Sequence, residues 1–236
     1  MFDQISTRIF ADGADLDGIL SLAADPRIQG FTTNPTLMHK AGLTDYAAFA
    51  KSLLEKISDQ PISFEVFADD EDEIRRQAHI IGSWGENVYV KVPVTTTTGE
   101  SLASLIRELS EDGVKVNATA LFTTAQVELI STAVRDGAPS CISVFAGRIA
   151  DAGVDPVPII ASAVEIIAQA PCSELIWASP REIFNLVQAN LVGCHIITVS
   201  GDLLRKLDCL GKDLTQYSLE TVRMFHDDAM AAGFAL

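Results

Sequence analysis

Short apolar segments alternate with longer segments of helical periodicity along the whole chain, and this alternation constrains the fold more than any other feature. The apolar segments recur at intervals of roughly 20 to 35 residues, a spacing typical of βα units in which a helix joins parallel strands. Several are nearly continuous apolar runs, as expected for strands covered on both faces. We predict eight strands, at Arg8–Asp12, Gly30–Asn34, Ile62–Phe67, Val88–Val94, Lys115–Ala120, Cys141–Ala146, Glu174–Ser179 and His195–Val199.

The segments between these strands carry apolar residues at helical spacing. In Thr44–Ser58, Phe49 and Leu53 are four residues apart and share one helical face. Gly99–Asp112 shows the same periodicity, and Gly113 follows it at the position where glycine commonly ends a helix. Further helices are predicted at Thr123–Arg135, from Asp155-Pro156 onward, at Pro180–Val192 and at Leu214–Ala232.

Strands that alternate with helices in this way form either a closed barrel or an open, doubly wound sheet. The GxGxxG and GxxxxGK[ST] motifs of nucleotide-binding open sheets are absent from the sequence. The length of 236 residues suits a compact eightfold barrel, and no linker or charge block divides the chain. We therefore predict an α/β fold over residues 1–236, a single (β/α)8 TIM barrel. The extra C-terminal helix packs outside the barrel or against another subunit of a homo-oligomer.

Charge and composition argue against several classes of function. The net charge of -15 disfavours nucleic acid as a partner, because phosphate backbones select basic surfaces, although a few arginines can still bind a small anion. No stretch approaches the roughly 18 apolar residues of a membrane helix, and the N-terminal residues do not form a signal peptide. The four cysteines lack metal-site spacing, which predicts free thiols packed in the core, no metal, and a cytoplasmic protein without a membrane partner.

Polar residues stand at the C-terminal ends of the predicted strands, which converge on one mouth of a barrel. Lys91 is the most informative, because valines flank it on both sides in Val88–Val94. Burial there disfavours the charged ammonium, and a neutral amine is a nucleophile toward carbonyls. The alternative is a structural lysine that reaches solvent or pairs with an acid. The other polar residues are Asp12, Asn34, Glu65, Asn117, Thr119, Ser143, Arg148, Ser179, Arg181 and Ser200.

The acidic residues and Asn34 each have two interpretations. Asp12 and Glu65 are either structural salt-bridge partners or the proton donors and acceptors that Schiff-base chemistry requires. Asn34 precedes Pro35, and on local grounds this pair predicts a helix cap followed by the first helical residue.

The roles of the amide, hydroxyl and guanidinium side chains are also open. Asn117 and Thr119 are two residues apart, so they face the same side of their strand, and in the barrel interior they would bind hydroxyl groups or a water. Arg148 and Arg181 each follow a strand. They are either solvated surface residues or a clamp for a substrate phosphate.

Five motifs, in this order and spacing, resemble those of the transaldolase family. They are Phe31–Leu37 (FTTNPTL), Val90–Thr95 (VKVPVT), Val116–Thr123 (VNATALFT), Ile142–Ile149 (ISVFAGRI) and Ala178–Arg181 (ASPR). The resemblance covers nearly the whole length. It implies a class I enzyme without metal or cofactor, which transfers a dihydroxyacetone unit from sedoheptulose 7-phosphate or fructose 6-phosphate to an aldose phosphate in the pentose phosphate pathway.

The resemblance also implies a role for each polar residue of the mouth except Ser200. Lys91 would form an imine with the ketose, and Asp12 would take the proton of the C4 hydroxyl as the C3–C4 bond breaks. Glu65 and Thr119 would hold a water that carries protons. Asn34 and Asn117 would orient the dihydroxyacetone hydroxyls, with Ser143 nearby, and Arg148, Ser179 and Arg181 would bind the terminal phosphate.

Two positions bear on the reaction within this family. The related fructose-6-phosphate aldolases carry Gln where Glu65 stands and Tyr where Phe145 stands. A tyrosine hydroxyl can help to protonate the enamine and release free dihydroxyacetone, whereas Phe145 cannot, which favours transfer. Departures from the family pattern at Gly13, Ala118, Val144 and Pro180 leave open an aldolase that releases dihydroxyacetone, or a transaldolase for a sulfonated sugar. A non-catalytic sugar-phosphate-binding barrel is the third alternative.

Overall fold

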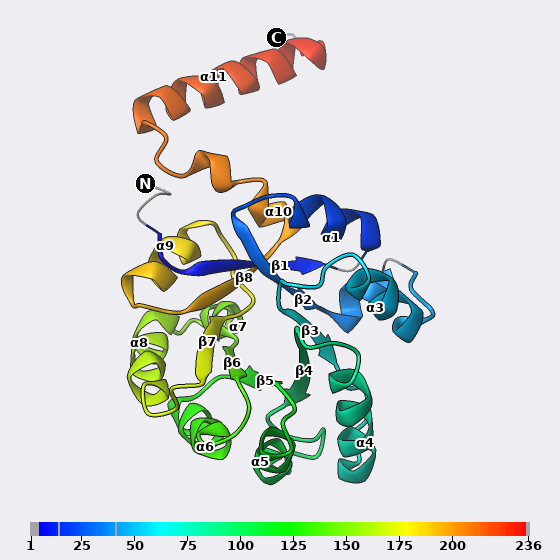
Figure 1. Ribbon diagram of the computed structural model, residues 1–236. Helices are drawn as coiled ribbons and strands as arrows, with labels where there is room; N and C mark the ends of the chain where they lie inside the picture. Colours follow the sequence, from blue (N-terminus) through cyan, green and yellow to red (C-terminus); the bar gives the residue numbers. More distant parts are fainter. Residues whose placement is uncertain (1–4, 14, 41, 235–236) are drawn as a thin grey trace.

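The computed structural model describes residues 5–13, 15–40 and 42–234, so what was expected of Met1–Gln4 and of Ala14 lies outside the described residues. Parallel strands close into a barrel in the order β1 to β8, with helices around the outside (Figure 1). The predicted (β/α)8 barrel is confirmed. The strands are β1 Arg8–Gly13, β2 Ile28–Thr33, β3 Ile62–Glu65, β4 Val88–Pro93, β5 Val116–Leu121, β6 Ser140–Val144, β7 Ser173–Trp177 and β8 Ile196–Ser200.

The helices begin and end largely where local sequence signals direct. The side chain of Asp155 caps the helix that starts at Pro156, and Gly113 adopts a φ of 89° after the helix that ends at Glu111. The helices are α1 Leu16–Ala23, α2 Pro35–Lys40, α3 Tyr46–Leu54, α4 Glu71–Gly82, α5 Ala103–Glu111, α6 Thr124–Val134, α7 Ala146–Asp151, α8 Pro156–Ile167, α9 Phe184–Leu191, α10 Gly201–Leu204 and α11 Leu214–Ala231, with a 3-10 turn at Leu207–Cys209.

Several predicted bounds differ from the structure in both halves of the barrel. Helix α3 ends at Leu54 rather than Ser58, α5 begins at Ala103 rather than Gly99, and β3 ends at Glu65 rather than Phe67. Strand β6 ends at Val144 because α7 begins at Ala146, and β7 ends at Trp177, so Ser179 lies in a loop. Helix α9 begins at Phe184 rather than Pro180. The Asn185 side chain accepts two backbone N–H groups from the preceding turn, which holds that turn outside the helix. Helices α1, α4, α7 and α10 had not been assigned from the sequence.

Alternation along the strands separates the inside of the barrel from its outer layer. In β4, Val88, Val90 and Val92 are buried in the main core, whereas Tyr89 and Lys91 occupy the other face. A second apolar cluster inside the barrel includes Phe10, Cys141, Ile176, Ala178 and Ile196, with Tyr89 and Phe145 packed against it. Apolar side chains therefore fill part of the barrel interior, and polar side chains gather toward the C-terminal ends of the strands.

Gly30 shows how tightly that interior is filled. A Cβ atom at this position would lie 2.6 Å from the ring of Phe10, so the absence of a side chain on β2 makes room for the aromatic ring on β1.

Helix α11 differs from the helices of the barrel wall. It extends away from the barrel (Figure 1), and none of its residues is buried. Leu214, Val222 and Phe225 are each at least 60% exposed. Few large apolar side chains on the rest of the surface are exposed to this extent. The predicted extra C-terminal helix is present, and in this chain it lies outside the barrel.

The cysteines follow the prediction only in part. Cys141 and Cys194 are buried, but Cys172 is exposed and Cys209 is partly exposed, because they lie on surface turns rather than on strands. All four are free thiols. Within residues 5–13, 15–40 and 42–234, none of the helices combines the length and the apolar character needed to cross a membrane.

Candidate active site

A cavity of about 90 Å³ lies at the C-terminal ends of the strands, where the polar residues converge. Its lining residues come from both halves of the barrel and belong to separate parts of the sequence. The lining residues are Asp12, Thr32, Asn34, Lys91, Asn117, Thr119, Ser143, Phe145, Arg148, Ala178, Ser179 and Thr198.

A larger groove of about 910 Å³ lies outside the barrel, beside α1 and α10. The guanidinium of Arg27 in this groove is already bonded to Asp25 and Asp208. The small cavity, rather than the groove, therefore gathers the groups suited to chemistry.

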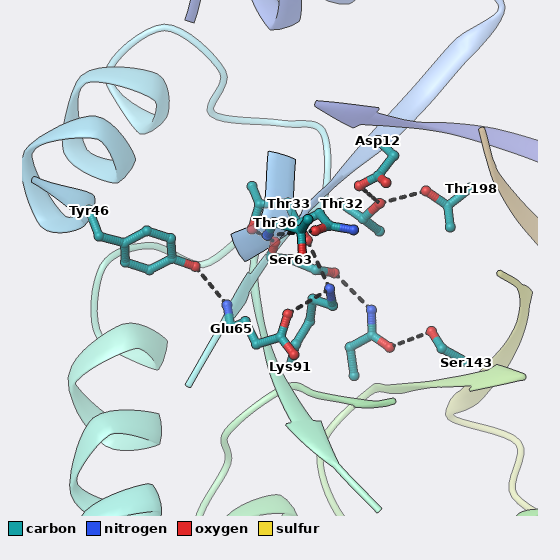
Figure 2. Close-up of polar contacts among 12 residues, drawn as sticks. Asp12, Thr32, Thr33, Thr36, Tyr46, Ser63, Glu65, Lys91, Ser143 and Thr198 are labelled. Carbon is teal, nitrogen blue, oxygen red and sulfur yellow. Dashed lines mark hydrogen bonds and ion pairs between the residues drawn. The ribbon is translucent and has the colours of Figure 1, made fainter. Parts of the chain in front are cut away.

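Lys91 lies in the wall of the cavity with its side chain only 12% exposed. Its Nζ donates to Glu65 Oε2 at 3.0 Å and to the backbone carbonyl of Thr33 at 2.8 Å (Figure 2). The lysine thus pairs with an acid, as the structural interpretation required. It also faces a polar cavity, as the catalytic interpretation required, so both features are present together.

Strand register aligns the neighbours of Lys91. Glu65 pairs with Lys91 between β3 and β4, and Lys91 pairs with Asn117 between β4 and β5. The amide of Asn117 is fully buried, donates to Ser63 Oγ at 3.0 Å and accepts from Ser143 Oγ at 2.7 Å. This network fixes the orientation of the Asn117 amide beside the amine.

Asp12 enters the cavity from β1 with a hydrogen-bonded chain behind it. Thr32 Oγ1 donates to Asp12 Oδ1 at 3.1 Å, and the hydroxyls of Thr32 and Thr198 are 2.5 Å apart, so Thr198 donates to Thr32 (Figure 2). Burial raises the pKa of the Asp12 carboxyl above its usual range, although Lys91, Thr32 and a side-chain hydrogen bond with Asn34 act in the opposite direction. A carboxyl in this environment holds a proton more readily than an exposed one.

Asn34 has both of the roles that its sequence context suggested. Its Oδ1 accepts the backbone N–H of Thr36 at 2.9 Å, which caps the helix that begins at Pro35. The same residue lines the cavity and contacts Asp12. Thr119 is buried and lines the cavity from the same strand as Asn117, so the expectation that both face the barrel interior is met.

The opposite side of the cavity is built from Phe145 and Arg148. The guanidinium of Arg148 lies over the Phe145 ring, 5.4 Å from its centroid, and this ring is 5.9 Å from that of Phe122. Arg148 is exposed and on the short helix α7, so its charge is held at the rim by stacking rather than by an acid.

Ser179 and Arg181 lie on the loop after β7, which packs closely on α7. Ser179 has a φ of 60°, and its carbonyl oxygen approaches Gly147 so closely that a Cβ there would lie 1.5 Å away. Ser179 lines the cavity, but Arg181 does not. Arg181 is ion-paired with Asp151, with Nε 3.1 Å from Oδ1 and a second contact from Nη2.

Comparison with known proteins identifies the family of this chain. The family model described as Transaldolase/Fructose-6-phosphate aldolase matches residues 9–236. The chain belongs to this family. The matched range includes Asp12, Lys91, Asn117 and Arg148, which line the same cavity.

Curated relatives agree with this family. A protein from Thermoanaerobacter sp. (strain X514) named "Probable transaldolase" is 34% identical over 230 residues, which cover 97% of this chain and 100% of the relative. A protein of the same name from Roseiflexus sp. (strain RS-1) is 37% identical over 192 residues, covering 81% and 84% of the two chains.

A solved structure supports the fold at lower identity. Dihydrodipicolinate synthase from Rhodopseudomonas palustris superposes with a TM-score of 0.58 at 16% identity, and the match covers 82% of this chain and 69% of that one. This likeness shows that the two proteins share a barrel architecture.

Most of the residues expected at the site of this family member line one cavity, but two do not. Glu65 lies behind Lys91 rather than in the lining, and Arg181 is turned to Asp151. Sequence reasoning did not single out Thr32, Thr33, Tyr46, Ser63 and Thr198, which hold the site residues (Figure 2). Thr198 had a signal, because it is a polar residue inside the apolar strand β8.

Proposed function

We propose that this protein is a transaldolase, which transfers a dihydroxyacetone unit between sugar phosphates through a Schiff base on Lys91. The observation that supports this most is the environment of the amine. It is mostly buried in the wall of a polar cavity, with Glu65 Oε2 3.0 Å away and an uncharged carbonyl at 2.8 Å. A lysine nucleophile needs a base that can take its proton, and Glu65 is within reach.

The first stage is imine formation. Lys91 Nζ, after giving a proton to Glu65, bonds to the carbonyl carbon of the ketose. The former carbonyl oxygen gains protons and leaves as water, so a protonated imine remains. Glu65 and Thr119 hold the water through which these protons move. Asn34, Asn117 and Ser143 bind the hydroxyls of the dihydroxyacetone unit.

The second stage is cleavage and transfer. The carboxylate of Asp12 takes the proton of the C4 hydroxyl, the electrons of the C3–C4 bond move into the imine, and the aldose phosphate leaves. The enamine on Lys91 then attacks the acceptor aldehyde, and Asp12 returns its proton to the new hydroxyl. Addition of water to the resulting imine releases the new ketose phosphate and the free Lys91 amine. Burial raises the pKa of Asp12, which suits a group that must hold a proton between the two half-reactions.

The terminal phosphate binds at the rim, at Arg148 and Ser179. Arg148 has no acidic partner among the ion pairs of residues 5–13, 15–40 and 42–234, and its guanidinium is held over Phe145. Arg181 joins the phosphate by exchanging Asp151 for it. An exposed ion pair contributes little free energy, so a dianion that also contacts Arg148 can displace the carboxylate.

Phe145 supports transfer rather than release of free dihydroxyacetone. Its ring lines the cavity and offers no proton donor to the enamine. Product analysis with fructose 6-phosphate separates the two reactions. Transfer requires erythrose 4-phosphate as acceptor, whereas an aldolase forms free dihydroxyacetone without it. A sulfonated ketose in the same assay tests the third reaction.

The Schiff base is tested directly by trapping. Incubation with fructose 6-phosphate and sodium borohydride should reduce the imine to a stable amine, and peptide mass analysis should locate the adduct on Lys91. An adduct on another lysine, or turnover without any adduct, would show that Lys91 is not the nucleophile. Full turnover in the presence of a chelator would agree with metal-free chemistry.

We also propose that the protein works as a homo-oligomer in the cytoplasm. Helix α11 carries exposed Leu214, Val222 and Phe225 and contributes nothing to the core of its own chain. Burial of these side chains against another copy would remove their apolar surface from water. Sedimentation of the full chain, compared with a chain that ends at residue 212, tests this assembly.

A further inference from the structure

The seam between β2 and β3 opens just beside Lys91. The two strands pair at Phe31–Ile62 and Thr32–Ser63, and the pairing stops there. The backbone N–H of Phe31 donates to the carbonyl of Pro61, so a continued ladder would bring the N–H of Glu65 to the carbonyl of Thr33. In the structure, other hydrogen bonds replace this bond between the Glu65 N–H and the Thr33 carbonyl.

Two other groups bond to the Glu65 N–H and to the Thr33 carbonyl. The N–H of Glu65 donates to the phenolic oxygen of Tyr46 at 2.7 Å, and the carbonyl of Thr33 accepts from Lys91 Nζ at 2.8 Å (Figure 2). The hydroxyl of Thr33 donates to the carbonyl of Ser63 at 2.8 Å, which joins the strands without restoring the ladder.

Tyr46 is built into this position. It is the first residue of α3, and its ring packs edge-on against Phe64 and Phe67, with centroid distances of 6.0 and 4.6 Å. Its oxygen also forms a hydrogen bond with the Thr33 side chain. Burial raises the pKa of Tyr46 to about 12, so the hydroxyl stays neutral near pH 7.

We propose that Tyr46 is a positioning residue, which holds the β2–β3 seam open so that the carbonyl of Thr33 and the carboxylate of Glu65 together hold the Lys91 amine. This inference rests on the proposed Schiff-base function. Without the phenol, Glu65 N–H would bond to the Thr33 carbonyl, and the strands would close to the roughly 4.8 Å spacing of a continuous ladder. The amine would then lose room between its two acceptors.

Tyr46→Phe removes only the hydroxyl and keeps the ring that packs on Phe64. We expect kcat to fall by roughly tenfold while KM for fructose 6-phosphate stays within about twofold, because the change affects the amine and not the sugar-binding groups. The rate of borohydride trapping should fall in parallel. A crystal structure of the variant should show the ladder extended to Thr33 and Phe64.

The matched control is Tyr89→Phe. Tyr89 lies two residues before Lys91 on β4, is also half-buried and packs on the apolar cluster inside the barrel. This variant should keep kcat and KM within about twofold of the parent. If both variants have the same kcat, or if the seam stays open in Tyr46→Phe, the positioning role is wrong.

Two further measurements distinguish failure of the positioning role from failure of the proposed function or of folding. If the parent protein forms no adduct on Lys91, the proposed function itself fails, whatever the variants do. If the Tyr46→Phe variant melts far below the Tyr89→Phe variant, the Thr33→Val variant is measured in its place. Thr33→Val removes the hydroxyl that bonds Ser63 and Tyr46, with little change of shape. A severalfold loss of kcat in Thr33→Val supports the proposal, and an unchanged kcat overturns it.

Discussion

The two sides of the cavity are built in different ways. On the amine side, Asp12, Glu65, Lys91 and Asn117 project from strands and are fixed by register and by hydrogen bonds to one another's neighbours. On the rim side, Arg148 and Arg181 come from a short helix and a loop, and both are exposed. Strands thus hold the groups proposed for bond making, and exposed side chains of the rim are the groups proposed to bind the charged end of a substrate. Removal of a group should therefore cost most on the amine side.

The largest effect is expected for Lys91→Arg. The guanidinium keeps the positive charge but is not a nucleophile near pH 7, so kcat should fall at least about a thousandfold and trapping should give no adduct. Lys115→Arg is the control, because Lys115 lies just before β5, away from the cavity, and its Nζ donates to the backbone carbonyl of Glu86. Residual turnover above one-hundredth of the parent rate would contradict the assignment.

Asp12→Asn should reduce kcat by about a hundredfold or more, since an amide cannot take the C4 hydroxyl proton. It should also stabilise the protein at pH 7. Burial raises the pKa of Asp12 in the folded state, so the folded state binds more protons than the unfolded state above about pH 4, and stability is lost as pH rises through this window.

Thermal unfolding of Asp12→Asn and of the parent checks the second effect. The variant should melt at a higher temperature at pH 7, and the difference should shrink as the pH falls below about 4, where the carboxyl becomes protonated in both states. A variant that melts lower at pH 7 would mean that attraction to Lys91 outweighs the cost of burying the carboxylate.

Arg148→Gln tests the rim side and should act mainly on binding. Loss of one charged partner should raise KM for a sugar phosphate by roughly 10- to 100-fold, with a smaller change in kcat. An unphosphorylated ketose should be affected by less than about threefold. Arg135→Gln, at an exposed position after α6, is the control. Equal losses with both kinds of ketose would show that Arg148 does not contact the phosphate.

The smallest effect is expected for Asp151→Asn. The change frees Arg181 from an exposed ion pair, so KM for the sugar phosphate should fall, by no more than about fivefold. The kinetic constants of the double variant Asp151→Asn, Arg181→Gln should show no such gain. A higher KM in the single variant would indicate that Asp151 orients Arg181 rather than competing with the phosphate.

The barrel follows from patterns in the sequence, which also predicted a set of polar residues at its mouth. Eight short apolar segments, separated by longer segments of which several have helical periodicity, leave few architectures that bury both faces of a parallel sheet. A lysine between buried valines, with acids on two other strands of the same barrel mouth, favoured a chemical role over a structural one, because packing alone does not select charge there. These signals are local in the sequence, so they can be recognised without knowing which distant residues come into contact.

The contacts between these polar groups, in contrast, depend on the folded chain. Arg148 and Arg181 looked equivalent in the sequence, yet one stacks on Phe145 and the other pairs with Asp151, since loop geometry depends on the close approach of Gly147 and Ser179. Tyr46 gave no signal, because it looks like an ordinary aromatic residue at the start of a helix. Its hydroxyl matters only because folding brings it to a gap between two strands, next to the carbonyl that holds Lys91.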